Sequence, residues 1–328
     1  IQALSPDQVA GIRPQTLGLF STEALAALQT DDFAKLQTDQ LRALTTVQVQ
    51  SLGSDSLIAL TTSQISVLRT DQIRALLTEQ VAALQSQDFR AMITEQLTVL
   101  ATDQVRAMES SDFAGLEPFQ VAALLSDQVA VLETSDLKGL STSQVGQLRA
   151  SQLRVLDTAQ IVALDPEDFR AIGTAGLSAL RTEQVAALEQ ADIIALDTAQ
   201  LAAMGTDQVV ALRAAQIGWL ENYDIAALRT DQIAVLTTAQ ADAFEPADAQ
   251  AILGDPDIAV LGVPFAASAT ERLRACVCLE QARPDAAYLG MLSVDPRSQR
   301  SGIGRSEEHT SELQSRQYLV CRLLLETK

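Results

Sequence analysis

The segment Arg181-Thr182-Glu183-Gln184-Val185-Ala186-Ala187-Leu188 is one copy of an eight-residue unit that fills most of the chain. From residue 5 to residue 252 the unit recurs 31 times without an insertion, and its positions are numbered 1 to 8 starting at residue 5. Position 8 is apolar in all 31 units, and position 5 is Val, Ile, Leu or Phe in 29 of them. A repeat of this kind indicates a solenoid, in which each unit buries its apolar side chains only against its neighbours.

The spacing of the apolar residues predicts short helices that are separated by corners. Positions 5 and 8 lie three residues apart and therefore share one face of a helix, whereas the next interval of five residues fits neither a continuous helix nor a strand. Within the units Pro occurs only at position 2, which suits the first turn of a helix; these residues are Pro6, Pro14, Pro118, Pro166 and Pro246. The sequence therefore predicts an all-α solenoid, or superhelix, of helices six to eight residues long with corners at positions 1 and 2. Thr or Ser fills position 2 in 22 units, and an N-cap at position 1 or at position 2 fits this pattern.

Composition excludes several classes of function. The chain of 328 residues has 42 acidic and 23 basic residues, a net charge of −19 and a single His. One His cannot form a multi-His metal site, and the negative charge argues against nucleic acid and anionic membranes as partners. No apolar run approaches the roughly 20 residues of a membrane span, and no signal peptide is recognisable at the first residue. We therefore expect no catalytic residue, no metal site, no cofactor and no membrane span, but a protein partner along the surface, in the cytoplasm or at the cell surface.

A longer period is superimposed on the repeat. Position 4 is Gln in 19 units, and in eight others it is Asp, namely Asp32, Asp88, Asp112, Asp136, Asp168, Asp192, Asp224 and Asp248. With Ser56 filling the first gap, these units recur on average every 27 residues, which predicts a superhelix of about 3.4 octads per turn with the Asp units along one edge. Two interpretations are open: a capping variant required at one corner of each turn, or an acidic stripe for a cation or a basic partner. A regular calcium loop needs several oxygen ligands within one short loop, which one or two acids per turn do not supply.

Residues 5–252 resemble the Thr-x-Gln-Val-x-Ala-Leu octapeptide arrays of long bacterial proteins. No enzymatic activity for this chain follows from the resemblance. Residues 1–260 are accordingly predicted to form an octapeptide-repeat α-solenoid, and the predicted function is that of an acidic, non-catalytic structural or protein-interaction scaffold.

The chain changes character after residue 260. The net charge is −20 over residues 1–260 and +1 over residues 261–328, and two apolar runs at 274–279 and 287–294 predict a small β-hairpin. The segment that follows, Val294-Asp295-Pro296 and then Gln299-Arg300-Ser301-Gly302-Ile303-Gly304, resembles the acetyl-CoA motif of GNAT-type N-acetyltransferases.

That resemblance implies a pyrophosphate-binding loop for acetyl-CoA, formed by Gln299, Arg300, Gly302 and Gly304. Residues 261–304 are then a truncated GNAT-like fragment, and the alternative function is an acetyl-CoA-dependent N-acetyltransferase in the intact gene. Residues 305–328 resemble the in-frame translation of a sequencing adapter, so this chain itself is expected not to catalyse acetyl transfer. The sequence fits either one gene or a chimera of two.

Overall fold

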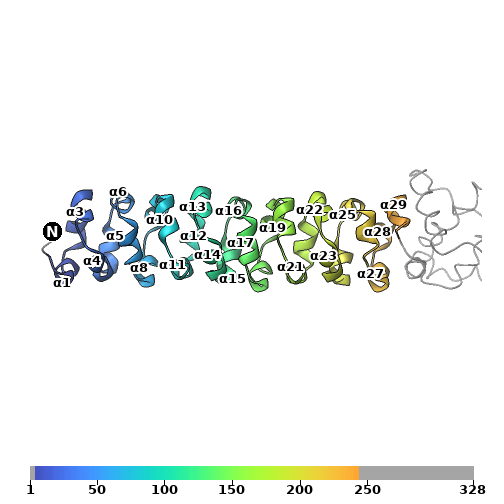
Figure 1. Cartoon of the computed structure of the whole chain (residues 1–328), viewed down its shortest axis with the longest axis horizontal. Helices are drawn as coiled ribbons and strands as arrows, with labels where there is room; N and C mark the ends of the chain where they lie inside the picture. Colours follow the sequence, from blue (N-terminus) through green and yellow to red (C-terminus); the bar gives the residue numbers. More distant parts are fainter. Residues whose placement is uncertain (1–3, 244–328) are drawn as a thin grey trace, which may run out of the picture. The chain divides into compact units, whose positions relative to one another are not determined.

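The computed structural model describes residues 4–243, which contain 29 helices and no strand. Within each of the two compact units given below, the short helices follow one another as in a solenoid (Figure 1). The all-α solenoid predicted for the array is therefore confirmed over these residues. The β-hairpin predicted for 274–294 and the predicted boundaries at 260 and 304 lie outside the described residues.

The chain divides into two compact units, of which the first ends at Ile172 and the second begins at Gly173. The first unit contains α1 (Pro6–Ala10), α2 (Pro14–Leu17), α3 (Thr22–Ala26), α4 (Thr30–Lys35), α5 (Thr38–Ala43), α6 (Thr46–Gln50), α7 (Ser54–Ile58), α8 (Thr62–Ile65), α9 (Thr70–Ala75), α10 (Thr78–Ala83), α11 (Ser86–Ala91), α12 (Thr94–Thr98), α13 (Thr102–Arg106), α14 (Ser110–Gly115), α15 (Pro118–Ala123), α16 (Ser126–Ala130), α17 (Thr134–Gly139), α18 (Thr142–Val145), α19 (Ala150–Val155) and α20 (Thr158–Val162).

Helix α21 (Pro166–Ala179) runs from the first unit into the second and is interrupted at Gly173. The second unit then contains α22 (Thr182–Ala187), α23 (Gln190–Ala195), α24 (Thr198–Ala203), α25 (Thr206–Ala211), α26 (Ala214–Ile217), α27 (Asn222–Ala226), α28 (Thr230–Ala234) and α29 (Thr238–Ala241).

Outside α21, the helix of each octad begins at position 2. In the octad of α10, Leu77 at position 1 is the extended N-cap (φ −76°, ψ 157°) and Leu84 at position 8 is extended again (φ −67°, ψ 151°). The N-cap is thus at position 1 and the corner at positions 8 and 1, not at positions 1 and 2 as predicted. The helices other than α21 are four to six residues long, most of them shorter than the predicted six to eight, because position 8 does not continue the helix and is extended in octads such as that of α10.

The apolar positions form the core, as predicted. From Leu25 to Leu228 every residue at position 5 and every residue at position 8 is buried, and Phe33, Phe89 and Phe169 have no exposed surface at all. A helix of about five residues is far too short to be stable in water on its own. The octads are therefore stabilised by stacking on other octads and not by their helical propensity.

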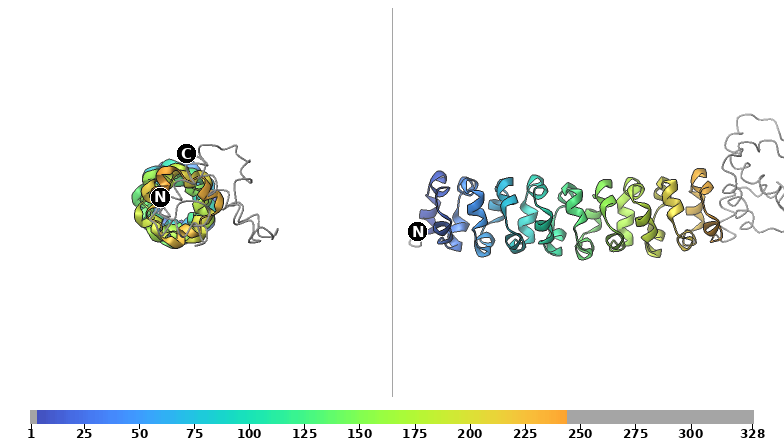
Figure 2. Two further views of the ribbon diagram at one scale, coloured as in Figure 1. Left: turned by 90° about the vertical axis from the view of Figure 1, so that its right-hand side faces the viewer. Right: turned by 90° about the horizontal axis from the view of Figure 1, so that it is seen from above.

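The stacking shows how many octads make one turn. In the first unit α1 packs on α4, α11 on α14 and α14 on α17, so the direct neighbour of a helix lies three octads away. Hydrogen bonds described below connect octads that lie four apart. One turn consequently takes between three and four octads, in agreement with the predicted 27-residue period. Figure 2 shows the helices of the first unit (blue to green) winding about an axis in this way.

Gly173 is the one described glycine with a positive φ. Its φ of 71° and ψ of 178° break α21 into two pieces, whereas position 1 in the other octads is extended with a negative φ. This conformation is essentially restricted to glycine because a Cβ atom would clash with the backbone. The break falls where the second compact unit begins.

Candidate functional site

The residue at position 4 forms a polar ladder inside the solenoid. The side-chain oxygen of Gln72 accepts a hydrogen bond from the backbone N–H of Arg69 at 2.8 Å, and its amide nitrogen donates to the carbonyl oxygens of Leu41 at 2.8 Å and Leu44 at 2.9 Å. One side chain therefore caps its own helix and ties it to the octad four units earlier. The other glutamines that make all three bonds are Gln40, Gln48, Gln64, Gln80, Gln96, Gln104, Gln120, Gln128, Gln144 and Gln152 in the first unit, and Gln208, Gln216, Gln232 and Gln240 in the second.

The Asp variant at position 4 makes a different connection. One oxygen of Asp112 accepts the backbone N–H of Glu109 at 2.8 Å, and the other accepts the hydroxyl of Ser86 at 3.0 Å. Asp136 is bonded in the same way to its own corner at 2.7 Å and to the hydroxyl of Ser110 at 2.7 Å. The shorter side chain thus reaches the octad three units earlier, where a hydroxyl at position 2 is the donor, and not the octad four units earlier.

The capping interpretation of the Asp units is confirmed. Each accepts the N–H of its own corner, and this bond is present for Asp32, Asp88, Asp112, Asp136, Asp168, Asp192 and Asp224. These side chains are 2 to 7% exposed, so they do not form the exposed acidic stripe that was the other interpretation. Among the described residues no group of three or more His, Cys, Asp or Glu could hold a metal ion.

Burial controls the ionisation of these carboxyl groups. Desolvation raises the pKa of Asp88, Asp112, Asp168 and Asp224 above the ordinary value of 3.8. For Asp112, hydrogen bonds from the Glu109 backbone and the Ser86 hydroxyl oppose that shift. A buried carboxylate without a basic partner is costly, and hydrogen bonds only partly offset the loss of hydration.

Arginine at position 1 reinforces the connection between turns. The guanidinium of Arg149 donates to the carbonyl oxygen of Leu124 at 3.1 Å, and that of Arg213 donates to Leu188 at 3.1 Å. The carbonyl of Leu124 also accepts the amide of Gln152 at 2.8 Å, so both lone pairs of the position-8 carbonyl are used. These arginines therefore belong to the stacking of the octads.

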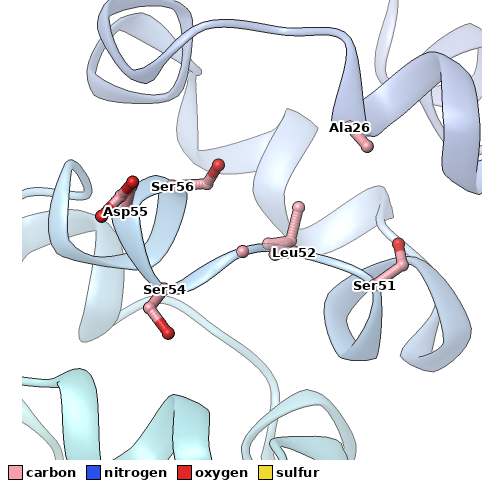
Figure 3. Close-up of a pocket in the computed structure, with 7 residues that line it drawn as sticks. Ala26, Ser51, Leu52, Ser54, Asp55 and Ser56 are labelled. Atoms are coloured by element: carbon pink, nitrogen blue, oxygen red, sulfur yellow. The ribbon is translucent and has the colours of Figure 1, made fainter.

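A shallow depression of about 400 Å³ lies between α3 and α7 in the first unit. Its lining residues are Ala26, Ser51, Leu52, Gly53, Ser54, Asp55 and Ser56. Figure 3 shows Ser56 on one side, Ala26 on the other and Leu52 between them. The depression coincides with one of the four octads in which position 4 is neither Gln nor Asp, namely the octad of Ser56.

The site predicted from the sequence, Gln299, Arg300, Gly302 and Gly304, lies outside the described residues. Sequence reasoning recognised the frequent Gln at position 4 but missed its role in the core. The available signal was that Gln or Asp occupies position 4 in 27 of the 31 units, because a strong preference for two residue types at one position indicates a specific structural role.

Comparison with known families supports the repeat. A family model described as ALTTAQ repeat matches residues 25–62, 56–86, 81–118, 129–166, 161–189 and 185–222, which together make up more than half of the chain. A comparison with curated proteins finds no match. The motif covers positions 7, 8, 1, 2, 3 and 4 of the octad, as in Ala195-Leu196-Asp197-Thr198-Ala199-Gln200. It therefore describes the corner, the N-cap and the glutamine of the ladder.

Proposed function

Because this chain belongs to the ALTTAQ repeat family, we propose that it is a non-catalytic scaffold whose acidic outer surface binds a basic protein partner. One observation carries the proposal: the polar side chains at position 4 are buried and bonded to the backbone. They are thus used by the fold and are not offered to a substrate. In the part of the chain from residue 4 to 243, no helix is long and apolar enough to cross a membrane.

The acidic residues that do face outward support a basic partner. Residues 4–243 contain 30 acidic and 14 basic residues, and seven of the acidic ones are the buried Asp residues at position 4. Exposed acids such as Glu95, Asp127 and Asp207 occupy position 3, in the first turn of their helices. A negative charge is favourable there because the N-terminus of a helix carries partial positive charge. The octad geometry therefore displays an excess of carboxylates at regular intervals.

A binding experiment with peptides of opposite charge tests the proposal. Fluorescence anisotropy should show binding of decalysine that weakens as the ionic strength rises from about 0.05 to 0.5 M, and no binding of decaglutamate. Neutralising Glu95, Asp127 and Asp207 to the corresponding amides should weaken decalysine binding about two- to fivefold. In the matched control, Arg74→Gln with Arg154→Gln should strengthen it. Equal affinity of all these variants for decalysine would show that the acidic surface is not the binding surface.

The alternative function rests on the motif at Gln299, Arg300, Gly302 and Gly304. We propose, as the alternative, that the intact gene encodes an acetyl-CoA-dependent N-acetyltransferase next to the array, and that the present chain is inactive because the sequence of residues 305–328 resembles a translated adapter and not the helix that follows the pyrophosphate loop in that family. Calorimetric titration of acetyl-CoA into the 328-residue chain should give no heat of binding. Micromolar binding with turnover of an amine would instead make the enzyme the primary function of this chain.

A further inference from the structure

The octad 53–60 differs from its neighbours at the ladder position. Between residues 37 and 172 all the remaining octads have Gln or Asp at position 4, whereas this octad has Ser56. The Ser56 side chain is too short to repeat the bonds of a glutamine, and no side-chain bond caps the N-terminus of α7. The depression described above lies at this place.

The regular geometry of the ladder identifies the backbone groups that a glutamine would contact here. Gln64 donates to Phe33, Ala34 and Leu36, which lie 31, 30 and 28 residues earlier in the chain. The same intervals from residue 56 lead to Leu25, Ala26 and Leu28, and Ala26 lines the depression.

The two backbone groups that a glutamine at residue 56 would bond lack hydrogen-bond partners among the described residues. Within residues 4–243, the Leu28 carbonyl accepts no hydrogen bond and the Gly53 N–H donates none. The corresponding groups in the octad of Gln72, the Leu44 carbonyl and the Arg69 N–H, are both bonded to the glutamine amide. Gly53 is exposed and Ser56 is half-buried, so a side chain from outside can reach the depression.

We propose that this depression is a binding site for a primary carboxamide, namely the glutamine side chain of a partner polypeptide. The amide oxygen would accept the N–H of Gly53, and the NH₂ group would donate to the carbonyls of Leu25 and Leu28. The methylene groups would lie against Leu52 and Ala26. This inference goes beyond the proposed function, because it does not depend on the acidic outer surface.

The lining selects an amide over the other side chains of similar size. The Leu25 and Leu28 carbonyls are acceptors, so they require a donor, and Asp55 at the rim is a carboxylate that repels an anionic side chain. A glutamate would therefore place an acceptor against two acceptors, and a methionine would leave the Leu28 carbonyl and the Gly53 N–H unbonded, although the Leu25 carbonyl keeps its bond from the Leu28 N–H. Each unmade hydrogen bond to a buried group costs on the order of a tenfold loss in affinity.

Amide NMR on the full chain tests the site. Titration with N-acetyl-L-glutamine N-methylamide should shift the Gly53 amide resonance to saturation, whereas the glutamate and methionine N-methylamides, which have no primary carboxamide, should bind at least about tenfold more weakly. Equal shifts with all three compounds, or none with the glutamine compound, would overturn the proposal.

A pair of variants provides the control. Ser56→Gln supplies the amide from within the chain, so it should slow hydrogen exchange of the Gly53 N–H about tenfold or more and abolish the effect of the probe. Ser56→Ala should leave probe binding intact. If Ser56→Gln neither protects Gly53 nor competes with the probe, the backbone groups are not arranged as the ladder requires and the site does not exist.

Discussion

Replacing one ladder glutamine should destabilise the solenoid by several kcal/mol. Gln128 is 1% exposed and makes three hydrogen bonds of 2.8 Å, to the N–H of Leu125 and to the carbonyls of Leu97 and Leu100. Each bond contributes about 1 kcal/mol net, and each buried group that is left unbonded adds to the loss. Gln128→Ala should therefore lower the free energy of unfolding by about 4 kcal/mol, including the packing that the side chain provides.

Urea unfolding followed by circular dichroism would measure this loss. An array of repeats need not unfold in a single step, so hydrogen exchange of the Leu125 amide gives a local measurement of the same effect. Gln147→Ala is the matched control, because Gln147 is exposed at position 7, and it should change the stability by no more than about 0.5 kcal/mol.

A second substitution separates hydrogen bonding from packing. Gln128→Met keeps the length of the side chain but none of its hydrogen bonds, so it should lose most of what Gln128→Ala loses. If the methionine variant were as stable as the unchanged protein, the glutamine ladder would be a packing element only, and the argument from hydrogen bonds would be refuted.

Three further predictions follow from the same geometry. Leu188→Asp should cost several kcal/mol in urea unfolding because it buries an unpaired charge at a side chain with no exposed surface, whereas Leu19→Asp, at a side chain that is 86% exposed, should be nearly neutral. Burial raises the pKa of the Asp112 carboxyl group in the folded protein. The stability that this group contributes is therefore fully present below its ordinary pKa of 3.8 and is lost as the pH rises through its folded pKa. Asp112→Asn should reduce the fall in the free energy of unfolding over that pH range, and an unchanged pH profile would contradict this. Gly173→Ala should lower the melting temperature, because φ is 71° there, whereas Gly53→Ala should not, since φ is −70° and neither Cβ would meet an atom within 4 Å; equal effects would show that the backbone conformation at Gly173 is not the cause.

The core and the number of octads per turn could both be predicted from regular patterns in the sequence. Positions 5 and 8 keep their apolar character, and the Asp units recur at the interval of one turn. The N-cap could not be assigned, since position 1 holds residues such as Leu77, Arg69 and Gly205 that have no capping side chain. The cap acceptor comes instead from position 4 of the same helix.

The hydrogen bonds of the ladder could not be predicted from patterns within an octad. Its carbonyl acceptors lie 28 and 31 residues before each glutamine, and no spacing within an octad reveals which turn an amide will face. Helix length was overestimated for the same reason. Position 8 leaves the helix to present its carbonyl to the next turn, and this tertiary bond has no counterpart in helical propensity.

The choice between Gln and Asp at position 4 changes which octad of the preceding turn the side chain contacts. The ladder glutamines connect octads four units apart, whereas Asp112 and Asp136 connect octads three units apart. The Asp-linked octads approach each other closely: a Cβ on Gly115 would lie 3.0 Å from the Ser86 Cβ, and one on Gly139 would lie 3.2 Å from the Ser110 carbonyl oxygen. Glycine at position 7 gives room for this contact in the octads of Asp112 and Asp136, whereas the octads of Asp88, Asp168, Asp192 and Asp224 have Ala there and that of Asp32 has Lys. Position 4 therefore connects successive turns of the superhelix through hydrogen bonds, while positions 5 and 8 form its apolar core.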